Sequence, residues 1–478
     1  MIQGYDKNRR DRTLLAWVLS FRKWRKIMEL DMTKGNPSKL IAKFIIPIII
    51  GNIFQQLYSM VDTIIVGRFV GVKALAAVGA TGSVTFLILG FTQGLTTGFT
   101  VMTAQRFGAG DREGMKKSIA SAAILSVFVT VIMTGVSMAG MDGLLKVMNT
   151  PEDIFGMAKE YIMIICAGIC CNVLYNLLAS VLRAIGNSLV PLLLLVISSV
   201  INIVLDYVLI VYGHMGVAGA AYATIISQGV SGVLCLVYIV RSVPALHVER
   251  RHLRLEGQCV RNQLNVGIPM ALQFSITAVG TILVQAALNL LGSTVVASYS
   301  VSCKVEQLVT QPFAAMGVTM ATYCAQNRGI NDLGRISKGV KTANVMSAVY
   351  AVFIYGVVYM ILPFAIGLFV TGDIADVYGY ARTYIIICGA FFIPLGMIFI
   401  FRNALQGCGF GFLPMMGGVV ELLSRAAAAF AAARLLSYEG VCLANASAWF
   451  TAGVFLWIVY RIMMKRMLRD KAAFEAAA

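Results

Sequence analysis

The sequence predicts an all-α integral membrane protein with twelve transmembrane helices in two pseudo-symmetric six-helix bundles. Three observations support this fold class. Of the 478 residues, 59% are apolar and 13% are charged, whereas a soluble protein has roughly 45 to 50% and about 25%. Hydrophobic stretches of the ~20 residues needed to cross a bilayer recur along the chain. The sequence after residue 260 also resembles the sequence after residue 40.

The expected spans divide the chain into two lobes of six helices. A basic tail (1–40) precedes a first lobe (41–240), and a connector (241–263) leads to a second lobe (264–463) and a basic C-terminal tail (464–478). Apolar residues at helical spacing between Leu14 and Met28 are consistent with an interfacial amphipathic helix in the first tail. The alternative is a dispensable extension before a body that begins near Met32. The predicted spans are 41–69, 74–99, 118–141, 160–182, 190–211, 217–240, 264–291, 295–323, 343–369, 380–401, 412–435 and 441–463.

The positive charge follows the expected topology. The net charge is +17, and 30 of the 39 Lys and Arg residues fall in the two tails and in alternate loops. Because basic residues concentrate on the cytoplasmic side, both termini are predicted to be cytoplasmic, in a bacterial-type plasma (inner) membrane. The surplus charge then faces anionic lipid, which argues against a nucleic-acid partner. The ten cysteines lie in or beside hydrophobic segments and are interpreted as small apolar residues.

An internal repeat relates the two lobes. The loop QRFGAGDREGMKK returns as QNRGINDLGRISK, which aligns Gln105 with Gln326 at an offset of 221. Later positions align at an offset of 223, for example Gly186 with Gly409. Six helices per copy is an even number, so the repeats are parallel. This architecture is typical of carriers in which two lobes rock about a central cavity.

Two acids of the first lobe are the strongest functional candidates. An ionisable group at the centre of a membrane helix costs at least about 2.5 to 3.5 kcal/mol, so each is a functional candidate by default. Asp62, Asp206 and Thr224 are all predicted to lie roughly 10 Å inside the outer face, at ~1.5 Å per residue. Asn202 lies one turn from Asp206 on the same helical face. The second-lobe counterparts of Asp62, Asn202, Asp206 and Thr224 are Val284, Arg425, Ala429 and Ala448.

This asymmetry favours function over packing, because a packing role would be needed in both bundles. A carboxylate in low-dielectric surroundings binds and releases a proton nearer neutral pH than one in water. Two carboxylates, an amide and a hydroxyl also offer the oxygen ligands of a small metal cation, so Asp62, Asn202, Asp206 and Thr224 are predicted to bind either H+ or Na+. Pro47, earlier in the helix that carries Asp62, leaves a backbone carbonyl free and permits a bend.

Other polar residues within the spans have two interpretations. Each either lines the passage or joins helices by a hydrogen bond or ion pair, and the sequence favours an internal ion pair for the charged residues of the second lobe. These candidates are Gln55, Gln56, Gln273, Gln285, Lys304, Glu306, Glu421 and Arg425.

Four segments resemble the multidrug and toxic compound extrusion (MATE) family of secondary transporters. They are FIIPIIIGNIFQQLYSMVDTIIVGRFVGVKALAAVG, LRAIGNSLVP, NIVLD and GVAGAAYAT, within a resemblance that runs from about residue 33 to 465. The resemblance implies a MATE-like fold with a central cavity, and export of organic, often cationic, compounds in exchange for H+ or Na+.

In the branch of the family with its coupling site in the first lobe, the ligands fall on Asp62, Asn202, Asp206 and Thr224. The bending proline falls on Pro47, and Asn176 is a candidate further ligand. Another branch uses acids in helices 7 and 10. The corresponding spans here, 264–291 and 380–401, contain neither Asp nor Glu.

The predicted function is therefore a cation-coupled antiporter that exports drugs and toxic compounds by alternating access. The alternative is a flippase for lipid-linked oligosaccharides or peptidoglycan precursors, which should have several inward-facing Arg residues. An enzyme is not expected, because His214, His247 and His252 lie in loops and no catalytic motif is present. An ATP-binding motif is also absent. The expected partners are therefore small organic substrates and membrane lipids, and neither ATP nor another cofactor is expected. The protein is expected to function as a monomer.

Overall fold

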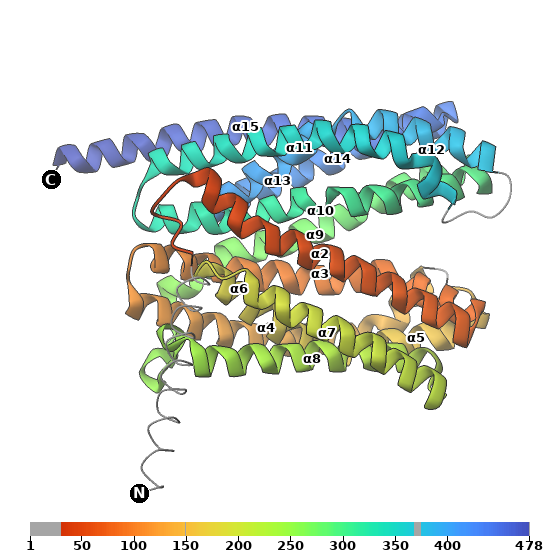
Figure 1. The fold of residues 1–478 in the computed structure, drawn as a ribbon, viewed down its shortest axis with the longest axis horizontal. Coiled ribbons are helices and arrows are strands. Elements are labelled where there is room, and N and C mark those ends of the chain that lie inside the picture. Colours follow the sequence, from red (N-terminus) through yellow and green to blue (C-terminus); the bar gives the residue numbers. More distant parts are fainter. Residues whose placement is uncertain (1–29, 149, 368–373, 478) are drawn as a thin grey trace, which may run out of the picture.

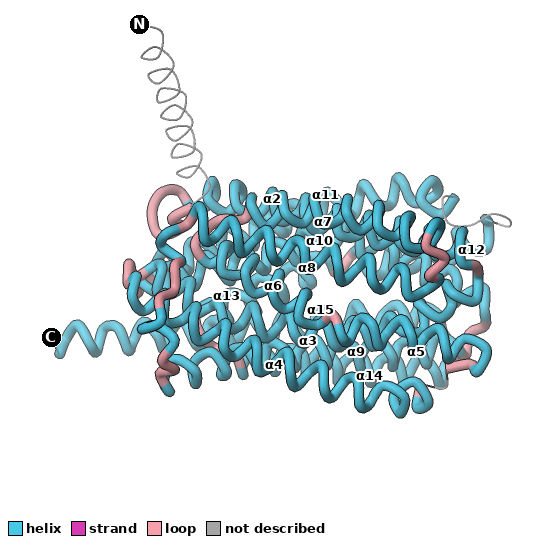
Figure 2. Tube along the Cα trace, turned by 90° about the horizontal axis from the view of Figure 1, so that it is seen from below, coloured by secondary structure: helices cyan, strands magenta, loops and turns pink. Residues whose placement is uncertain are grey.

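The protein is built from long helices arranged in two bundles. The computed structural model describes residues 30–148, 150–367 and 374–477, and no strand occurs among them. Figure 1 shows the helices from α2 to α8 in one bundle and those from α9 to α15 in the other. Most loops gather at the two ends of the molecule (Figure 2). The amphipathic helix predicted before residue 29 lies outside the described residues.

The first bundle contains the following elements: α2 (Pro37–Ile65), the π-helical turn η1 (Val66–Val70), α3 (Val72–Gly108), α4 (Arg112–Val147), α5 (Glu152–Ala167), α6 (Ile169–Ala184), α7 (Leu189–Tyr207), the π-helical turn η2 (Val208–Tyr212) and α8 (Gly216–Ser242). Two short 3-10 helices, η3 (Pro244–Leu246) and η4 (Arg250–Leu253), form the connector. The second bundle contains α9 (Gly257–Asn289), α10 (Ser293–Gly329), α11 (Leu333–Gly367), α12 (Ile374–Gly389), α13 (Phe392–Gly407), α14 (Phe412–Leu435) and α15 (Tyr438–Ala477).

The spans follow the prediction with two corrections. Predicted helices 4 and 10 are each a pair of helices: α5 and α6 meet at 46°, and α12 and α13 meet at 49°. With each pair counted as one span, eleven spans in the described part of the chain are long and apolar enough to cross a membrane. The twelfth, α10, is 37 residues long. It is more polar than the others because it carries Lys304, Glu306 and several hydroxyl and amide side chains.

Local signals explain where two of the helices begin. Asn36 caps α2 by accepting a hydrogen bond from the Ser38 amide at 2.9 Å, and Pro37 occupies the first turn, where no amide donor is needed. Asp111 caps α4 by accepting from the Gly114 amide at 2.8 Å. Polar caps at these loops fix the ends of helices whose interiors are almost wholly apolar.

Helix α2 belongs to both bundles. Its first half, including Ile41, Phe44 and Ile48, packs in the core of the second bundle. Its last residue, Ile65, packs in a core cluster of the first bundle. Pro47 lies in the half that packs in the second core, directly before Ile48, and the helix continues through it without a break. Any relative movement of the two bundles must therefore be accommodated by α2.

The chain that leads into α2 ties the bundles together at the end where α2 begins and α15 finishes (Figure 1). The Met32 side chain is fully buried, and its amide donates to Gln326 Oε1 at 2.9 Å. Arg335 donates to the carbonyls of Met32 and Gly35 at 3.1 and 2.8 Å. On the other side, the Leu30 amide donates to the Gly186 carbonyl at 3.3 Å.

The two bundles close upon each other at this same end through repeat-related residues. Gln105 donates to the Gly407 carbonyl at 2.8 Å, and its counterpart Gln326 donates to the Ala184 carbonyl at 2.9 Å. Gly108 lies so close to the Gln326 backbone that a Cβ atom there would be 2.0 Å from its carbonyl oxygen. Gly329 meets the Gln105 carbonyl in the same way. The repeat therefore supplies a symmetric closure, in which glycine permits backbone contact.

Candidate functional site: a buried carboxylate cluster

Three of the four predicted ligands come together on α2 and α7. These helices pack against each other, and α7 also packs against α8. Asp206 is fully buried and Asn202 is 1% exposed, one turn earlier on the same face of α7. Asp62 is partly buried on α2. The charges of Asp62 and Asp206 are close enough to interact.

The polar atoms of this cluster are unsatisfied. Among the described residues, both carboxylate oxygens of Asp206, Oδ1 of Asp62, and both Oδ1 and Nδ2 of Asn202 are buried without a hydrogen-bond partner. A buried polar atom without a partner costs about 1–3 kcal/mol, and a charged one costs more. These five unpartnered atoms on three neighbouring residues make the cluster the candidate functional site.

Two tyrosines border the cluster, and the sequence analysis did not identify them. Tyr58 lies one turn before Asp62 on α2, and Tyr161, from α5, is 8% exposed. Both tyrosines lie within electrostatic reach of Asp62 and Asp206. The spacing from Tyr58 to Asp62 was a usable signal. Tyr161 was not recognisable, because only the fold brings α5 to this place.

A π-helical turn begins within four residues after each acid. Asp62 precedes η1, and Asp206 precedes η2 by two residues. The two turns contact each other. A π turn leaves the regular i to i−4 hydrogen bonding of the helix, and such turns occur frequently at functional sites. In the second bundle, α14 runs through the positions equivalent to η2 as α-helix, whereas α9 ends at Asn289, the counterpart of Arg68 in the middle of η1.

The other two candidate ligands have partners of their own. The Thr224 hydroxyl donates to the Ala220 carbonyl of its own helix at 3.0 Å. Asn176 donates to the carbonyl and the side-chain oxygen of Asn172 at 2.9 and 3.1 Å. Asn172 in turn donates to Gln228 Oε1 at 3.0 Å, so Asn176 belongs to an amide network between α6 and α8.

The second bundle has a buried ion network that includes Arg425, the repeat counterpart of Asn202. Glu421 accepts from Arg425 at 2.7 Å and from Arg402 at 3.1 Å, and all three side chains are at most 10% exposed. The predicted ion pair between Glu421 and Arg425 is therefore present. Arg402 is a third member that the sequence analysis missed. Glu306 accepts a hydrogen bond from the Tyr384 hydroxyl.

The remaining polar candidates are dispersed. Gln273 accepts from Gln406 at 3.1 Å within the second bundle, and Gln285 donates to Asn289 at 2.8 Å along α9. Gln55 forms a hydrogen bond with Tyr58, beside the carboxylate cluster. Gln56 is partly buried and Lys304 is exposed.

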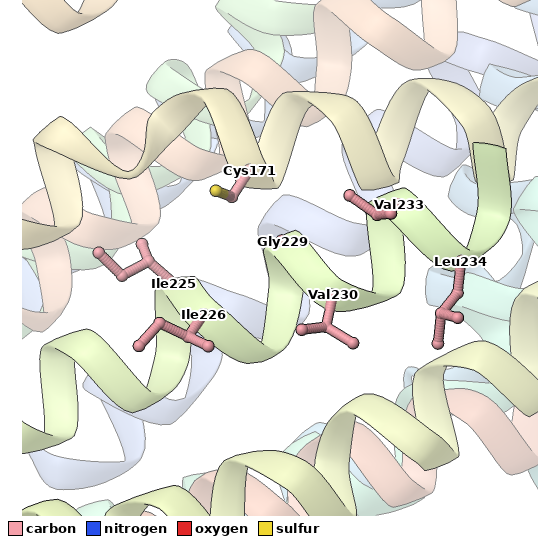
Figure 3. Close-up of a pocket in the computed structure, with 7 residues that line it drawn as sticks. All are labelled: Cys171, Ile225, Ile226, Gly229, Val230, Val233 and Leu234. Carbon is pink, nitrogen blue, oxygen red and sulfur yellow. The ribbon is translucent and has the colours of Figure 1, made fainter. Parts of the chain in front are cut away.

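An apolar groove of about 400 Å³ lies between α6 and α8, away from the cluster. Figure 3 shows Cys171 of α6 facing Ile225, Gly229 and Val233 of α8 across it. Its lining contains none of the predicted site residues. With no polar group to orient a ligand, this groove carries no chemistry of its own.

The fold and the cluster together define a class of protein. Two repeat-related helical bundles are joined at one end, and among the described residues the buried carboxylate oxygens without a partner lie only in the first of them. This is the architecture of a secondary transporter. The sequence profile of the MatE family matches residues 47–208 and 269–430, once in each bundle. The chain belongs to this family, whose members are transporters.

Known relatives and solved structures agree with this assignment. The chain is 29% identical to the "Probable multidrug resistance protein YpnP" of Bacillus subtilis over 64% of this chain and 68% of that protein. It is 24% identical to the "Probable multidrug resistance protein NorM" of Thermotoga maritima, over 79% of this chain and 82% of that protein.

A solved structure described as an "Outward-facing conformation of a multidrug resistance MATE family transporter of the MOP superfamily" has a TM-score of 0.87 to this chain. The match covers 92% of this chain and 98% of that chain, and the two sequences are 22% identical. A "Crystal structure of MATE in complex with MaL6" has the same TM-score and identity and covers 92% and 99% of the two chains. These likenesses support the fold of two six-helix lobes.

Proposed function

We propose that this MATE transporter exports organic compounds, including drugs, from the cell in exchange for a cation. The multidrug resistance names of its relatives support the substrate class. The carboxylate cluster supports the coupling. The single observation that carries the proposal is the group of unsatisfied oxygens at Asp206, Asn202 and Asp62. In our proposal these oxygens bind H+ or Na+, and the bound ion is lost as substrate is taken up.

The proposed exchange needs a link between ion binding and lobe movement, and α2 is the candidate. It carries Asp62 in the first lobe and begins in the core of the second. Neutralising Asp62 and Asp206 removes their mutual repulsion and lets α2 and α7 approach. A bend at Pro47 then transmits this change to the cytoplasmic closure, which gives alternating access. Energy comes from the ion gradient, and the basic ends face the cytoplasm of a bacterial plasma membrane.

The flippase alternative is less well supported by the arrangement of charges. It predicts several arginines on inward faces. Arg402 and Arg425 are instead shared by Glu421 inside the second bundle. The charged network therefore holds helices together, and it leaves few cations to meet a pyrophosphate-linked lipid.

The test is ion release and uptake by purified protein in proteoliposomes when a cationic dye such as ethidium is added. Release of a proton, seen with an external pH indicator, identifies H+ as the coupling ion. Uptake of radioactive sodium against the dye identifies Na+. Dye transport that persists with neither ion gradient and moves neither ion would contradict the proposal.

A further inference from the structure

A small cavity lies between the two lobes, directly above their cytoplasmic closure. Its volume is about 30 Å³, and α3, α6 and α10 line it. Ala104 and Ala325 lie in its wall, and the residues that follow them, Gln105 and Gln326, make the symmetric closure below. The cavity therefore lies between the lobes, next to this closure.

The cavity lies on the pseudo-symmetry axis of the molecule. Thr100 and Val101 of α3 line one side, and their repeat counterparts at the offset of 221, Ala321 and Thr322 of α10, line the other. Four positions of α3 contribute, and all four counterparts on α10 contribute as well. A site on this axis contacts both lobes and is altered whenever they move.

One charged residue breaks this symmetry. Arg183 of α6 lines the cavity, together with Ser180 one turn earlier. The counterpart of Arg183 in the second lobe is Gln406, whose amide donates to Gln273 at 3.1 Å instead. The second lobe thus forms the same helix end without a cation, so the fold does not require arginine at this position.

Among the described residues, Arg183 also has no acidic partner. In the described part of the chain, its one hydrogen-bond partner is Ser180 Oγ at 2.9 Å. The titratable groups within electrostatic reach of it are Tyr175 and Cys235, and neither is an Asp or Glu. Arg402 and Arg425, by contrast, share the carboxylate of Glu421. An arginine inside a membrane protein normally has a counter-charge, because leaving it unpaired is expensive.

We propose that this cavity is an anion-binding site for the carboxylate or phosphate group of an exported amphipathic compound. The guanidinium group of Arg183 presents a planar set of donors that suits such oxygens. The Ser180 hydroxyl, which accepts from Arg183, has its own proton free to donate, and the Thr97 hydroxyl lies in the same wall. The ligand's anionic group binds at the floor, and its apolar body lies above it between the lobes.

This inference rests on the proposed function only in taking the occupant to be an exported substrate. It extends the substrate class from cations to compounds with an anionic group. Equilibrium binding tests it without any transport step, so its failure is distinct from a failure of ion coupling.

The experiment compares riboflavin with flavin mononucleotide, which differ by one phosphate group. Binding of each to the full-length protein in detergent micelles is followed by flavin fluorescence polarisation. One charge-assisted contact contributes about 1.5–3 kcal/mol. The wild-type protein should therefore bind flavin mononucleotide at least about tenfold more tightly than riboflavin. Inorganic phosphate should weaken flavin mononucleotide binding and leave riboflavin binding unchanged.

Arg183→Gln installs the residue of the sister lobe and should reduce the preference to within about twofold, while riboflavin affinity is retained. Retained riboflavin affinity also shows that the variant is folded. Arg183→Lys keeps the charge without the bidentate geometry and should retain part of the preference. The matched control, Arg241→Gln, removes an exposed charge from the same end of the molecule and should bind as wild type.

Equal affinity of the wild type for both flavins, or no measurable binding of either, would overturn the proposal. So would an unchanged preference in Arg183→Gln. A lipid headgroup could supply the same phosphate chemistry, so the titration is repeated with phosphatidylglycerol or phosphatidylcholine in the micelles. Loss of flavin mononucleotide binding with phosphatidylglycerol alone would assign the site to lipid and overturn the substrate assignment.

Discussion

Asp206 lies within electrostatic reach of Asp62, and neither of its carboxylate oxygens has a hydrogen-bond partner in the described part of the chain. This relationship joins α7 of the first lobe to α2, which begins inside the second lobe. The second lobe has Ala429 and Val284 at the equivalent places. The two lobes therefore differ: one carries the carboxylate cluster, and the other carries an ion network of one glutamate and two arginines.

The ion network of the second lobe should be structural. Glu421→Gln leaves the guanidinium groups of Arg402 and Arg425 without a carboxylate, and breaking such a buried pair costs about 3–5 kcal/mol. We expect a clear fall in the thermal unfolding temperature of the purified protein. Glu439→Gln, at the exposed start of α15, is the control and should unfold as wild type. An unchanged unfolding temperature in Glu421→Gln would show that the network is dispensable.

The contact of Gly108 with the Gln326 backbone should control the closure between the two bundles. Gly108→Ala places a Cβ atom against the Gln326 backbone, which cannot move aside as a flexible side chain can. Overpacking of this kind costs about 1–3 kcal/mol, so the closed arrangement should lose population. Hydrogen exchange of the segments around Gln105 and Gln326 should become faster, and export should fall.

The control for this prediction is Gly143→Ala in α4, where an added Cβ atom meets no other atom within 4 Å. It should exchange and export as wild type. Equal hydrogen-exchange rates in Gly108→Ala and Gly143→Ala would mean that closure of the lobes does not need the close approach of Gly108 to the Gln326 backbone.

The stabilisation that Asp111 provides as the cap of α4 should depend on pH in the acid range. The hydrogen bond from the Gly114 amide, with a smaller contribution from Arg106, lowers the pKa of Asp111 below its ordinary value of 3.8. Because the pKa is lower in the folded chain, the stabilisation is complete above the ordinary value. This stabilisation is lost as the pH falls through the lowered pKa that Asp111 has in the folded chain.

Asp111→Ala should cost about 1 kcal/mol at neutral pH through loss of the cap. Asp111→Asn keeps a side-chain acceptor without a titrating group and should remove this part of the acid dependence. Stability measured against pH for the three proteins tests the assignment, and superimposable curves below pH 4 for wild type and Asp111→Asn would refute it.

The sequence predicted most of the fold because hydropathy and repeat spacing are local signals. The bends in predicted helices 4 and 10 were missed, since the apolar pattern runs through Gly168 without a break and through Gly389 in the same way. The polarity of α10 did not prevent its prediction, because its length and its place in the repeat were sufficient.

The candidate site was predictable where residues share one helix or a common depth. The sequence named Asp62, Asn202 and Asp206, and the structure brings them together; their role in coupling stays a prediction. Tyr161 and Arg402 were missed because each joins its cluster through tertiary packing alone. Asn176 and Thr224 were named by type and position, whereas the structure gives both side chains partners of their own.

The most direct test of the account is export from inverted membrane vesicles by Asp62→Asn and Asp206→Asn. Each substitution removes a charge and keeps the size of the side chain. The account predicts that export driven by a pH or sodium gradient is abolished in both variants, while expression and substrate binding remain. Gradient-driven export at the wild-type rate in both variants would contradict the claim that this cluster couples the ion to the substrate.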